Sequence, residues 1–196
     1  MSSDMPREVF LIQEGYVRMY TISLYIHELT IRIFAPGAAF SLIASLGGVT
    51  NHFFFEAFTK TRLTIIPQEV FKRVLDEDVT VIKNLNTNLL KGMAKITLRL
   101  GQAYYSTAPN KVISALFYFG KVMGHKEKNT IIFEEKIKHE DIANFAGLSR
   151  ENTSRVLKDL EHKGLVDLKY RHIKILDEEK LRIVVESDSL IRNCIQ

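Results

Sequence analysis

Hydrophobic and polar residues alternate along the first part of the chain. Val17 and Met19 alternate with Arg18 and Tyr20, as side chains do on the two faces of a β-strand. Similar short hydrophobic runs lie at residues 9–12, 28–34, 52–59 and 63–66. Glycine and proline separate these runs, as turn residues separate strands. Residues 1–77 are therefore predicted to form an antiparallel β-barrel or sandwich.

Three consecutive phenylalanines stand in the run at 52–59. In an extended strand Phe53 and Phe55 face one way and Phe54 faces the other. Such a cluster is compatible with a ligand pocket or with a packed core. Core packing is the interpretation that the alternation favours.

The hydrophobic spacing changes to that of a long helix over residues 78–106. Its apolar positions follow steps of three and four residues, the spacing of a coiled-coil seam, and a helix of about 28 residues extends roughly 42 Å. The alternative is an amphipathic helix that lies on its own barrel, with Leu90, Met93 and Leu98 as a second face. Residues 78–108 are predicted to be a dimerisation helix and hinge. The predicted dimer interface consists of Ile82, Leu85, Leu89, Gly92, Met93, Ile96, Leu100 and Ala103.

Residues 109–196 show the pattern of a winged helix-turn-helix. The boundary lies at 106–110, because Pro109 biases the residue before it out of the helical region. A helix follows, with apolar residues at Val112, Ile113, Leu116, Phe117 and Phe119. A short strand pair with its turn at 134–136 is expected next, and a closing helix with an acidic start is expected at 177–187.

Two short helices separated by a glycine lie at the centre of this part. The first is predicted to stop at Gly147, where a left-handed turn favours a residue without a Cβ. Ser149 can then cap a second helix whose inward face is Val156, Leu157 and Leu160, and Gly164 ends that helix. Two strands around a basic turn should follow, with Arg171 and His172 at the turn.

The second helix leaves a distinctive set of side chains outside. Arg150, Glu151 and Arg155 provide two guanidinium groups and a carboxylate, which can bind guanine and cytosine edges in the major groove. The alternative is a solvated helix face with an ion pair between Glu151 and Arg155.

Composition and motifs narrow the function further. The net charge of +4 permits a polyanionic partner without requiring one. The single cysteine, Cys194, rules out a disulfide framework or a cysteine-held cluster within one chain. The histidines show no metal-ligand spacing, and no phosphate-binding glycine loop, H-E-x-x-H or G-x-S-x-G motif occurs. We therefore expect neither an enzyme nor a bound cofactor or metal.

The hydrophobic runs are also too short for a membrane protein. None approaches the length needed to cross a bilayer, and the start MSSDMPREVF has no hydrophobic signal core. A cytoplasmic protein without a membrane partner is expected.

The run GLSRENTSRVL at 147–157 resembles the recognition-helix signature of the bacterial CRP/FNR family of transcription regulators. This resemblance implies that Arg150, Glu151, Ser154 and Arg155 contact bases. The segments LIQEGYVRMY and IFAPGAAFSL are similar to parts of that family's jelly-roll sensor domain. The implied fold class is α+β, with a partial antiparallel β jelly-roll sensor, a long dimerisation helix and a C-terminal winged helix-turn-helix.

The sensor departs from the family pattern in two ways. Only about eight residues precede the segment that matches the family's middle strands, so the first strands are expected to be missing. The stretch from 41 to 58 has no arginine and no Gly-Glu pair, which family members use to hold a cyclic phosphate. The sequence therefore argues against cyclic-nucleotide sensing and leaves the effector unidentified.

The resulting functional prediction is a homodimeric regulator that binds a palindromic promoter site in double-stranded DNA, with RNA polymerase as the implied protein partner. The alternative is a ligand-binding sensor that acts through protein partners and binds no specific DNA. The residues predicted to contact DNA phosphates are Lys138, His139, Ser149, Asn152, Thr153, Arg171 and His172.

Overall fold

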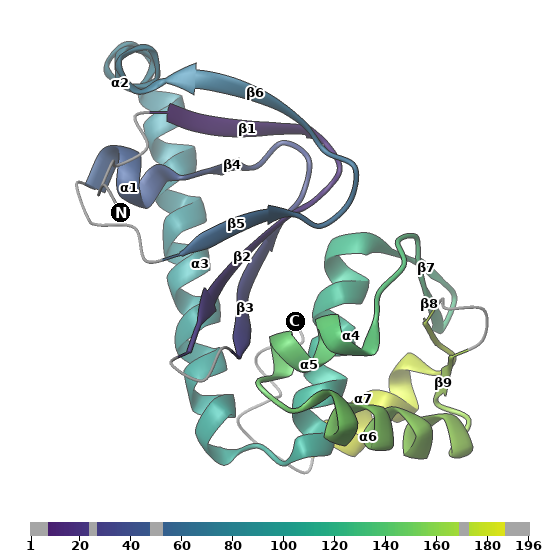
Figure 1. Cartoon of the computed structure of the whole chain (residues 1–196). Coiled ribbons are helices and arrows are strands. Elements are labelled where there is room, and N and C mark those ends of the chain that lie inside the picture. The colour runs from purple at the N-terminus through teal and green to yellow at the C-terminus, as the bar shows by residue number, and fades with distance from the viewer. Residues whose placement is uncertain (1–7, 24–26, 48–52, 169–172, 187–196) are drawn as a thin grey trace. The chain divides into compact units, whose positions relative to one another are not determined.

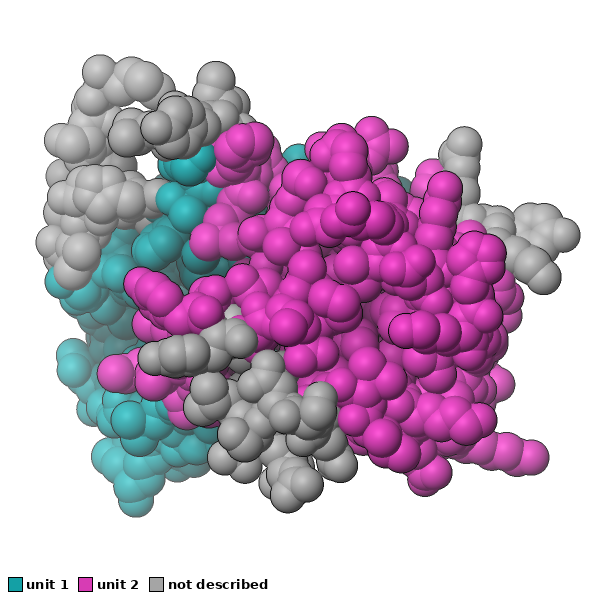
Figure 2. Space-filling view, turned by 90° about the horizontal axis from the view of Figure 1, so that it is seen from below, with its two compact units in different colours: residues 1–23, 30–92 teal, residues 24–29, 93–196 magenta. Residues whose placement is uncertain are grey.

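The computed structural model describes residues 8–23, 27–47, 53–168 and 173–186. The chain divides into two compact units, shown in teal and magenta in Figure 2. The first unit holds residues 1–23 and 30–92, and the second holds residues 24–29 and 93–196. The division between residues 92 and 93 falls inside the longest helix of the described residues. The three-part division at 77/78 and 108/109 stays a prediction.

The first unit contains two three-stranded sheets (Figure 1). In one sheet, strand β1 (Glu8–Glu14) lies between β4 (Ala39–Phe40) and β6 (Arg62–Pro67) and is antiparallel to both. In the other, β2 (Val17–Ile22) lies between β3 (Glu28–Phe34) and β5 (Phe54–Ala57). These strands confirm the predicted β-domain and the α+β fold class.

Phenylalanine packing confirms the predicted alternation in β5. The Phe55 ring lies 5.0 Å from that of Phe40, in a core that also contains Met19 and Phe34. Phe53 packs against the same core. Phe54 is on the opposite face and is half exposed, with its ring 5.5 Å from that of Tyr20. The aromatic cluster is therefore mainly part of a core.

The small-residue connection between β4 and β5 contains a short helix that the hydrophobic pattern did not predict, α1 (Leu42–Gly47). The Ser45 hydroxyl donates to the Glu8 carbonyl oxygen over 2.6 Å, and the Gln68 amide donates to the Ser45 carbonyl oxygen. These bonds tie α1 to the start of β1 and to the helix that follows β6.

Two helices follow the sheets: α2 (Gln68–Glu77) and α3 (Val79–Tyr105). Asp78 has an extended backbone between them, and its carboxylate accepts a bond from the Thr80 amide at 2.8 Å. The long helix was predicted at nearly these bounds. The alternative, in which Leu90, Met93 and Leu98 form a second face on the barrel, is not supported for Leu90 and Met93, because each residue is 66% exposed.

The second unit is built around α4 (Ala108–Met123), whose first turn contains Pro109. The other elements of this unit are β7 (Gly124–Glu127), β8 (Thr130–Phe133), α5 (His139–Ala146), α6 (Arg150–His162), β9 (Val166–Asp167), β10 (Lys174–Ile175) and α7 (Glu178–Glu186). Of these, β7, β8, α5, α6 and α7 pack on α4. Its four strands form one sheet in the order β7-β8-β10-β9.

The predicted position of the first hairpin turn is wrong. Strands β7 and β8 pair with each other, and the connection between them is Lys128 and Asn129 rather than residues 134–136. Lys128 has a φ of 56°, the left-handed conformation that tight hairpin turns require. Residues 134–136 instead lead from β8 toward α5.

A buried apolar core holds the second unit together. Leu116 and Phe119 of α4 are fully buried with Ile142 of α5, Leu157 of α6 and Leu181 of α7. Arg99, near the end of α3, also joins this unit: its guanidinium lies 3.9 Å above the Phe145 ring and donates to the Phe145 carbonyl oxygen. Burial lowers the pKa of Arg99 to about 10. The helix-turn-helix therefore rests on several elements at once.

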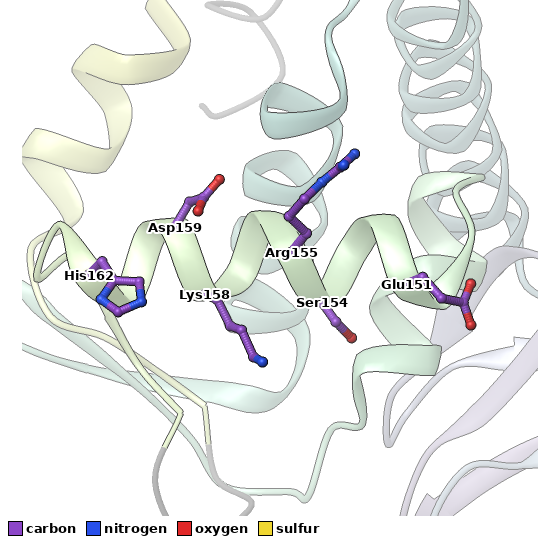
Figure 3. Close-up of a pocket in the computed structure, with 6 residues that line it drawn as sticks. All are labelled: Glu151, Ser154, Arg155, Lys158, Asp159 and His162. Carbon is purple, nitrogen blue, oxygen red and sulfur yellow. The ribbon is translucent and has the colours of Figure 1, made fainter.

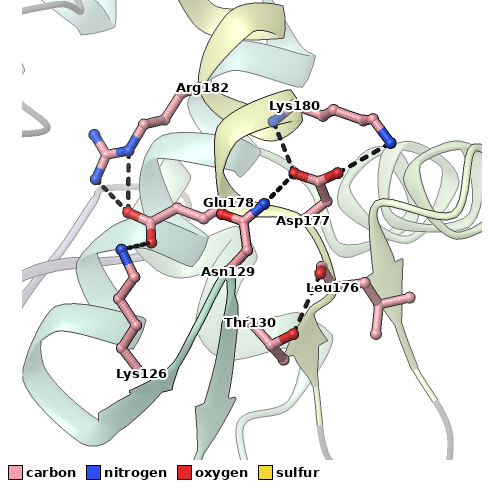
Figure 4. A network of polar contacts seen from close by, with 8 residues as sticks. All are labelled: Lys126, Asn129, Thr130, Leu176, Asp177, Glu178, Lys180 and Arg182. Carbon is pink, nitrogen blue, oxygen red and sulfur yellow. Dashed lines mark hydrogen bonds and ion pairs between the residues drawn. The ribbon is translucent and has the colours of Figure 1, made fainter.

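A polar network fixes the start of α7 to the β7–β8 hairpin (Figure 4). Lys126 and Arg182 each form an ion pair with the buried Glu178 carboxylate, at 2.6 and 2.5 Å. Asn129 donates to the Asp177 carboxylate over 2.7 Å. These contacts connect the first residues of α7 to the β7–β8 hairpin.

Candidate nucleic-acid interface

Local geometry forms the helix-turn-helix as the sequence predicts. Helix α5 ends at Gly147, which has a φ of 66°, and the Leu148 amide donates to the Ala143 carbonyl oxygen. The Ser149 hydroxyl then accepts from the Asn152 amide over 3.2 Å and caps α6. Gly164, with a φ of 68°, follows the end of α6. Both glycines therefore occupy left-handed positions that a side chain with a Cβ would strain.

Helix α6 divides into a buried face and an open face. Val156, Leu157 and Leu160 are buried, as predicted. Thr153 belongs to the same face, since its side chain has no exposed area. The prediction that Thr153 contacts a DNA phosphate is therefore wrong, because neither its hydroxyl nor its helix-bonded amide reaches the surface.

The open face is a shallow hollow along the outer side of α6. Figure 3 shows its lining side chains along one side of the helix, at successive steps of three and one residues. They are Glu151, Ser154, Arg155, Lys158, Asp159 and His162. Arg150, one residue before Glu151, is also exposed. Three of the four predicted base-reading side chains thus line one surface, with Arg150 exposed at its start.

The Arg155 guanidinium is held by Asn152, which the sequence analysis predicted to contact a DNA phosphate. Its Nη2 donates to the Asn152 Oδ1 atom over 2.9 Å. Glu151 and Arg155 form no ion pair with each other among the described residues. The simple charge pair of a solvated helix is therefore not what this face contains. The spacing of three residues between Asn152 and Arg155 was the signal that could have revealed their contact.

His139 joins the two helices of the motif. Its Nδ1 lies 2.9 Å from the Ser154 Oγ atom, so the first residue of α5 contacts the open face of α6. Burial, and then the charge of Arg150, lower the pKa of His139 below its usual 6.5; Lys158 acts in the same direction and Glu161 opposes them. No sequence signal indicated this contact across fifteen residues.

The remaining predicted phosphate contacts lie around this face. Lys138 is exposed, and its amide donates to the Asp141 carboxylate at the start of α5. Strands β9 and β10 pair as an antiparallel wing, with Lys174 opposite Asp167. Arg171 and His172, expected at the tip of the wing, lie outside the described residues.

The sensor stretch at 41–58 offers little charge to a ligand. Its one carboxylate, Glu56, accepts a 2.6 Å bond from the largely buried guanidinium of Arg18, which also lies over the Tyr20 ring. In the part of the chain that the structure describes, no three His, Cys, Asp or Glu side chains gather as metal ligands would. Within the same residues, no helix is long and apolar enough to span a bilayer.

Two protein-family models match the chain. The Crp-like helix-turn-helix domain matches residues 110–184, which include most of α4, both helices of the motif and the wing. The cyclic nucleotide-binding domain matches residues 2–78, which include both sheets of the first unit.

Curated proteins and solved structures agree with these matches. Transcriptional regulator SdrP of Thermus thermophilus is 27% identical over 184 residues, covering 93% of this chain and 86% of that protein. The cyclic AMP receptor protein of the same organism is 27% identical over 165 residues, covering 84% of this chain and 73% of that protein. The crystal structure of a CRP/FNR-family transcriptional regulator, also from Thermus thermophilus, has a TM-score of 0.77 at 26% identity, over 93% of this chain and 90% of that chain.

Proposed function

This chain belongs to the CRP/FNR family of transcription regulators, and we propose that it acts as a homodimer on a palindromic promoter site, with one α6 helix in the major groove of each half-site. The family assignment makes it a DNA-binding regulator with a helix-turn-helix domain rather than an enzyme. The dimer, the palindrome and the individual base contacts are the proposed part.

The open face of α6 carries the proposal. Arg150, Glu151 and Lys158 are exposed, and none of their side chains makes an ion pair or hydrogen bond with another described residue. A guanidinium can donate two bonds to guanine O6 and N7, and a carboxylate can accept from the cytosine amine. We assign Arg150 and Arg155 to guanines, Glu151 to a cytosine and Ser154 to a neighbouring base.

Phosphate contacts are assigned to groups around that face. The exposed Lys138 and the start of α6 at Ser149 are suited to bind the DNA backbone, because a helix N-terminus favours an anion. Arg171 and His172 remain predicted phosphate contacts of the wing. Asn152 supports base reading instead, since it holds the Arg155 guanidinium in place.

The exposed apolar residues of α3 support the homodimer. Leu89, Met93, Ile96 and Leu100 are between 46% and 66% exposed and are separated by steps of four, three and four residues. This is the spacing of a coiled-coil seam, and Ala103 continues it. Ile82, Leu85 and Gly92 are partly covered within the chain, so they are proposed to lie at its margin.

A two-fold dimer sets the form of the target. It would place two α6 helices in successive major grooves, so half-site centres should lie roughly 34 Å apart. RNA polymerase is the proposed protein partner at the promoter, and the cytoplasm, where bacterial promoters are transcribed, is the proposed location.

The effector is not a cyclic nucleotide in this proposal. The stretch at 41–58 has no arginine to bind a cyclic phosphate, and Glu56 is already paired with Arg18. The match to the cyclic nucleotide-binding domain therefore concerns the fold of the sensor. A sensor that acts only through protein partners is not favoured, because it would have no use for the open face of α6.

Selection of bound sequences from randomised duplex DNA tests the function. The purified chain should enrich a two-fold palindrome at fixed moderate salt, and adding cyclic AMP or cyclic GMP should leave the enriched sequence and yield unchanged. Enrichment only with a cyclic nucleotide would contradict the effector assignment. No enrichment under any condition would contradict sequence-specific binding by this chain.

Sedimentation of two matched variants tests the dimer. Ile96→Glu places a carboxylate in the proposed seam, whereas Ala94→Glu places one at an exposed position of α3 outside that seam. Ile96→Glu should shift the protein to monomers and abolish binding to the palindrome, and Ala94→Glu should do neither. Equal behaviour of the two variants would show that another surface holds the dimer.

A further inference from the structure

The contact between His139 and Ser154 lies beside the base-reading side chains but is not one of them. His139 is the first residue of α5 and is partly buried, and its Nδ1 lies 2.9 Å from the Ser154 Oγ atom. Ser154 lines the open face of α6 between Glu151 and Arg155. An imidazole on the other helix of the motif therefore holds a hydroxyl that faces the proposed position of the bases.

This contact decides what the Ser154 hydroxyl can offer to a base. A serine hydroxyl can donate one hydrogen bond and accept two. A hydrogen bond with an imidazole nitrogen occupies either the hydroxyl's donor or one of its two acceptor sites. If Nδ1 is unprotonated, Ser154 donates to it and turns its lone pairs outward. If Nδ1 carries a proton, Ser154 accepts from it and can donate to a base.

The surroundings of His139 favour the first arrangement. The charged groups that act on it are Arg150, Lys158 and Glu161, all on α6, and burial with the two cations keeps the imidazole neutral near neutral pH. A neutral imidazole has one N–H group, and a phosphate contact at Nε2 would require the proton there. With the proton on Nε2, as that proposed phosphate contact requires, Nδ1 is the acceptor.

We propose that His139 is a specificity-determining residue: its Nδ1 accepts a hydrogen bond from the Ser154 hydroxyl, so that the Ser154 oxygen accepts a hydrogen bond from the exocyclic amine of adenine or cytosine in the major groove. This rests on the proposed function, because it assigns a further residue to the same interface. His139 acts here through Ser154 and is a positioning residue, in addition to any phosphate contact of its own.

Deletion of single base amines tests the assignment. In the selected palindrome, each adenine is replaced in turn by purine, and each cytosine by 2-pyrimidinone, so that one amine is lost at a time. At one position per half-site, amine loss should weaken wild-type binding about five-fold, the effect of a single hydrogen bond. The same loss should have no effect on Ser154→Ala and at most a two-fold effect on His139→Ala.

The quantity to compare is the ratio of the affinity for the intact duplex to the affinity for the duplex that lacks one amine. His139→Ala is expected to weaken binding to every duplex if its imidazole contacts a phosphate, and this uniform loss cancels in the ratio. Equal sensitivity of wild type and His139→Ala to the amine deletion would overturn the proposal. The double variant His139→Ala/Ser154→Ala should show the same ratio of affinities, intact duplex over amine-deleted duplex, as Ser154→Ala alone. A different ratio would also overturn the proposal.

A measurement on the free protein separates this idea from the proposed function. Nitrogen-15 NMR of the imidazole should show unprotonated Nδ1 in wild type near neutral pH, and Ser154→Ala should change that nitrogen's chemical shift, while the exposed His162 on the same helix stays unchanged. Identical His139 shifts in both proteins would overturn the pairing. A correct NMR result without sequence-specific binding would contradict the proposed function and the base contact, but not the pairing.

Discussion

Two groups of polar and charged side chains in the second unit differ in whether their charges are paired within the protein. The closed cluster fixes α7 to the β7–β8 hairpin and consists of Lys126, Asn129, Asp177, Glu178, Lys180 and Arg182. The open face lies along α6 and is lined by Glu151, Ser154, Arg155, Lys158, Asp159 and His162, with Arg150 exposed at its start. In the closed cluster each charge has an opposite charge within 3.0 Å. On the open face, Arg150, Glu151 and Lys158 have no such partner in the described part of the chain.

This difference separates stability from recognition. The closed cluster should affect folding, because Lys126 and Arg182 stabilise the buried Glu178 carboxylate. Exposed charges without internal partners contribute little to folding and stay available to a polyanion. Arg155 is intermediate, because Asn152 holds it without cancelling its charge.

The largest effect is expected from the open face. Arg155→Ala should weaken binding to the selected palindrome by about 1 to 3 kcal/mol per half-site and relax the preference at one base pair. The free energy of unfolding should stay within about 0.5 kcal/mol of wild type, because the lost side chain is exposed. Fluorescence-anisotropy titrations of cognate and single-mismatch duplexes measure the first effect, and urea unfolding measures the second.

The closed cluster should behave in the reverse way. Glu178→Gln should lower the free energy of unfolding by about 2 kcal/mol, because Lys126 and Arg182 lose their shared carboxylate. The discrimination between cognate and mismatched duplex should be unchanged. Glu179→Gln is the matched control, since Glu179 is its exposed neighbour on the same helix and should change neither quantity appreciably. A larger loss in Glu179→Gln than in Glu178→Gln would break the comparison.

Loss of one helix cap should have a smaller effect. Ser149→Ala removes the hydroxyl that accepts from the Asn152 amide and should cost about 1 kcal/mol of stability. Thr107→Ala is the control, because Thr107 is the N-cap of α4 and its side chain makes no cap hydrogen bond. Thermal unfolding should rank Ser149→Ala below Thr107→Ala. The reverse order would mean that the Ser149 cap does not stabilise α6.

Lowering the pH should gradually remove the stabilising contribution of Glu178 in the closed cluster. Burial alone would raise the pKa of Glu178, but hydrogen bonds and charges of Lys126 and Arg182 outweigh burial and lower it below 4.5. Its stabilising contribution is therefore present above the ordinary pKa and is lost as pH falls through the lowered value. Unfolding between about pH 6 and about pH 3 should bring wild type and Glu178→Gln together. A constant difference across this range would contradict the shift.

Periodicity predicted much of the second unit because its signals are local. Gly147, Ser149 and Gly164 each act within one turn of chain, so their positions could be derived from neighbouring residues alone. The burial of Thr153 could also have been derived, because Thr153, Val156, Leu157 and Leu160 follow helical spacing, although its polar side chain suggested a phosphate contact.

Contacts between distant elements could not be predicted in the same way. Neither the hydrogen bond between His139 and Ser154 nor the stacking of Arg99 on Phe145 has a sequence signature, because each depends on how elements pack. The exposure of Leu90 and Met93 also depends on packing, since helical spacing shows which residues share a face but not what covers it. The base-reading set was accessible mainly through its resemblance to known recognition helices.

Methylation protection of guanine N7 on the selected palindrome tests the central claim most directly, because that atom lies in the major groove where the open face of α6 is proposed to bind. Wild-type protein should protect guanines in two symmetric clusters with centres about one helical turn apart. At DNA saturation, Arg155→Ala should lose protection at one symmetric pair of guanines and retain the others. Unprotected guanines at full occupancy, or an identical pattern for wild type, Arg155→Ala and Arg150→Ala, would contradict base reading by this face.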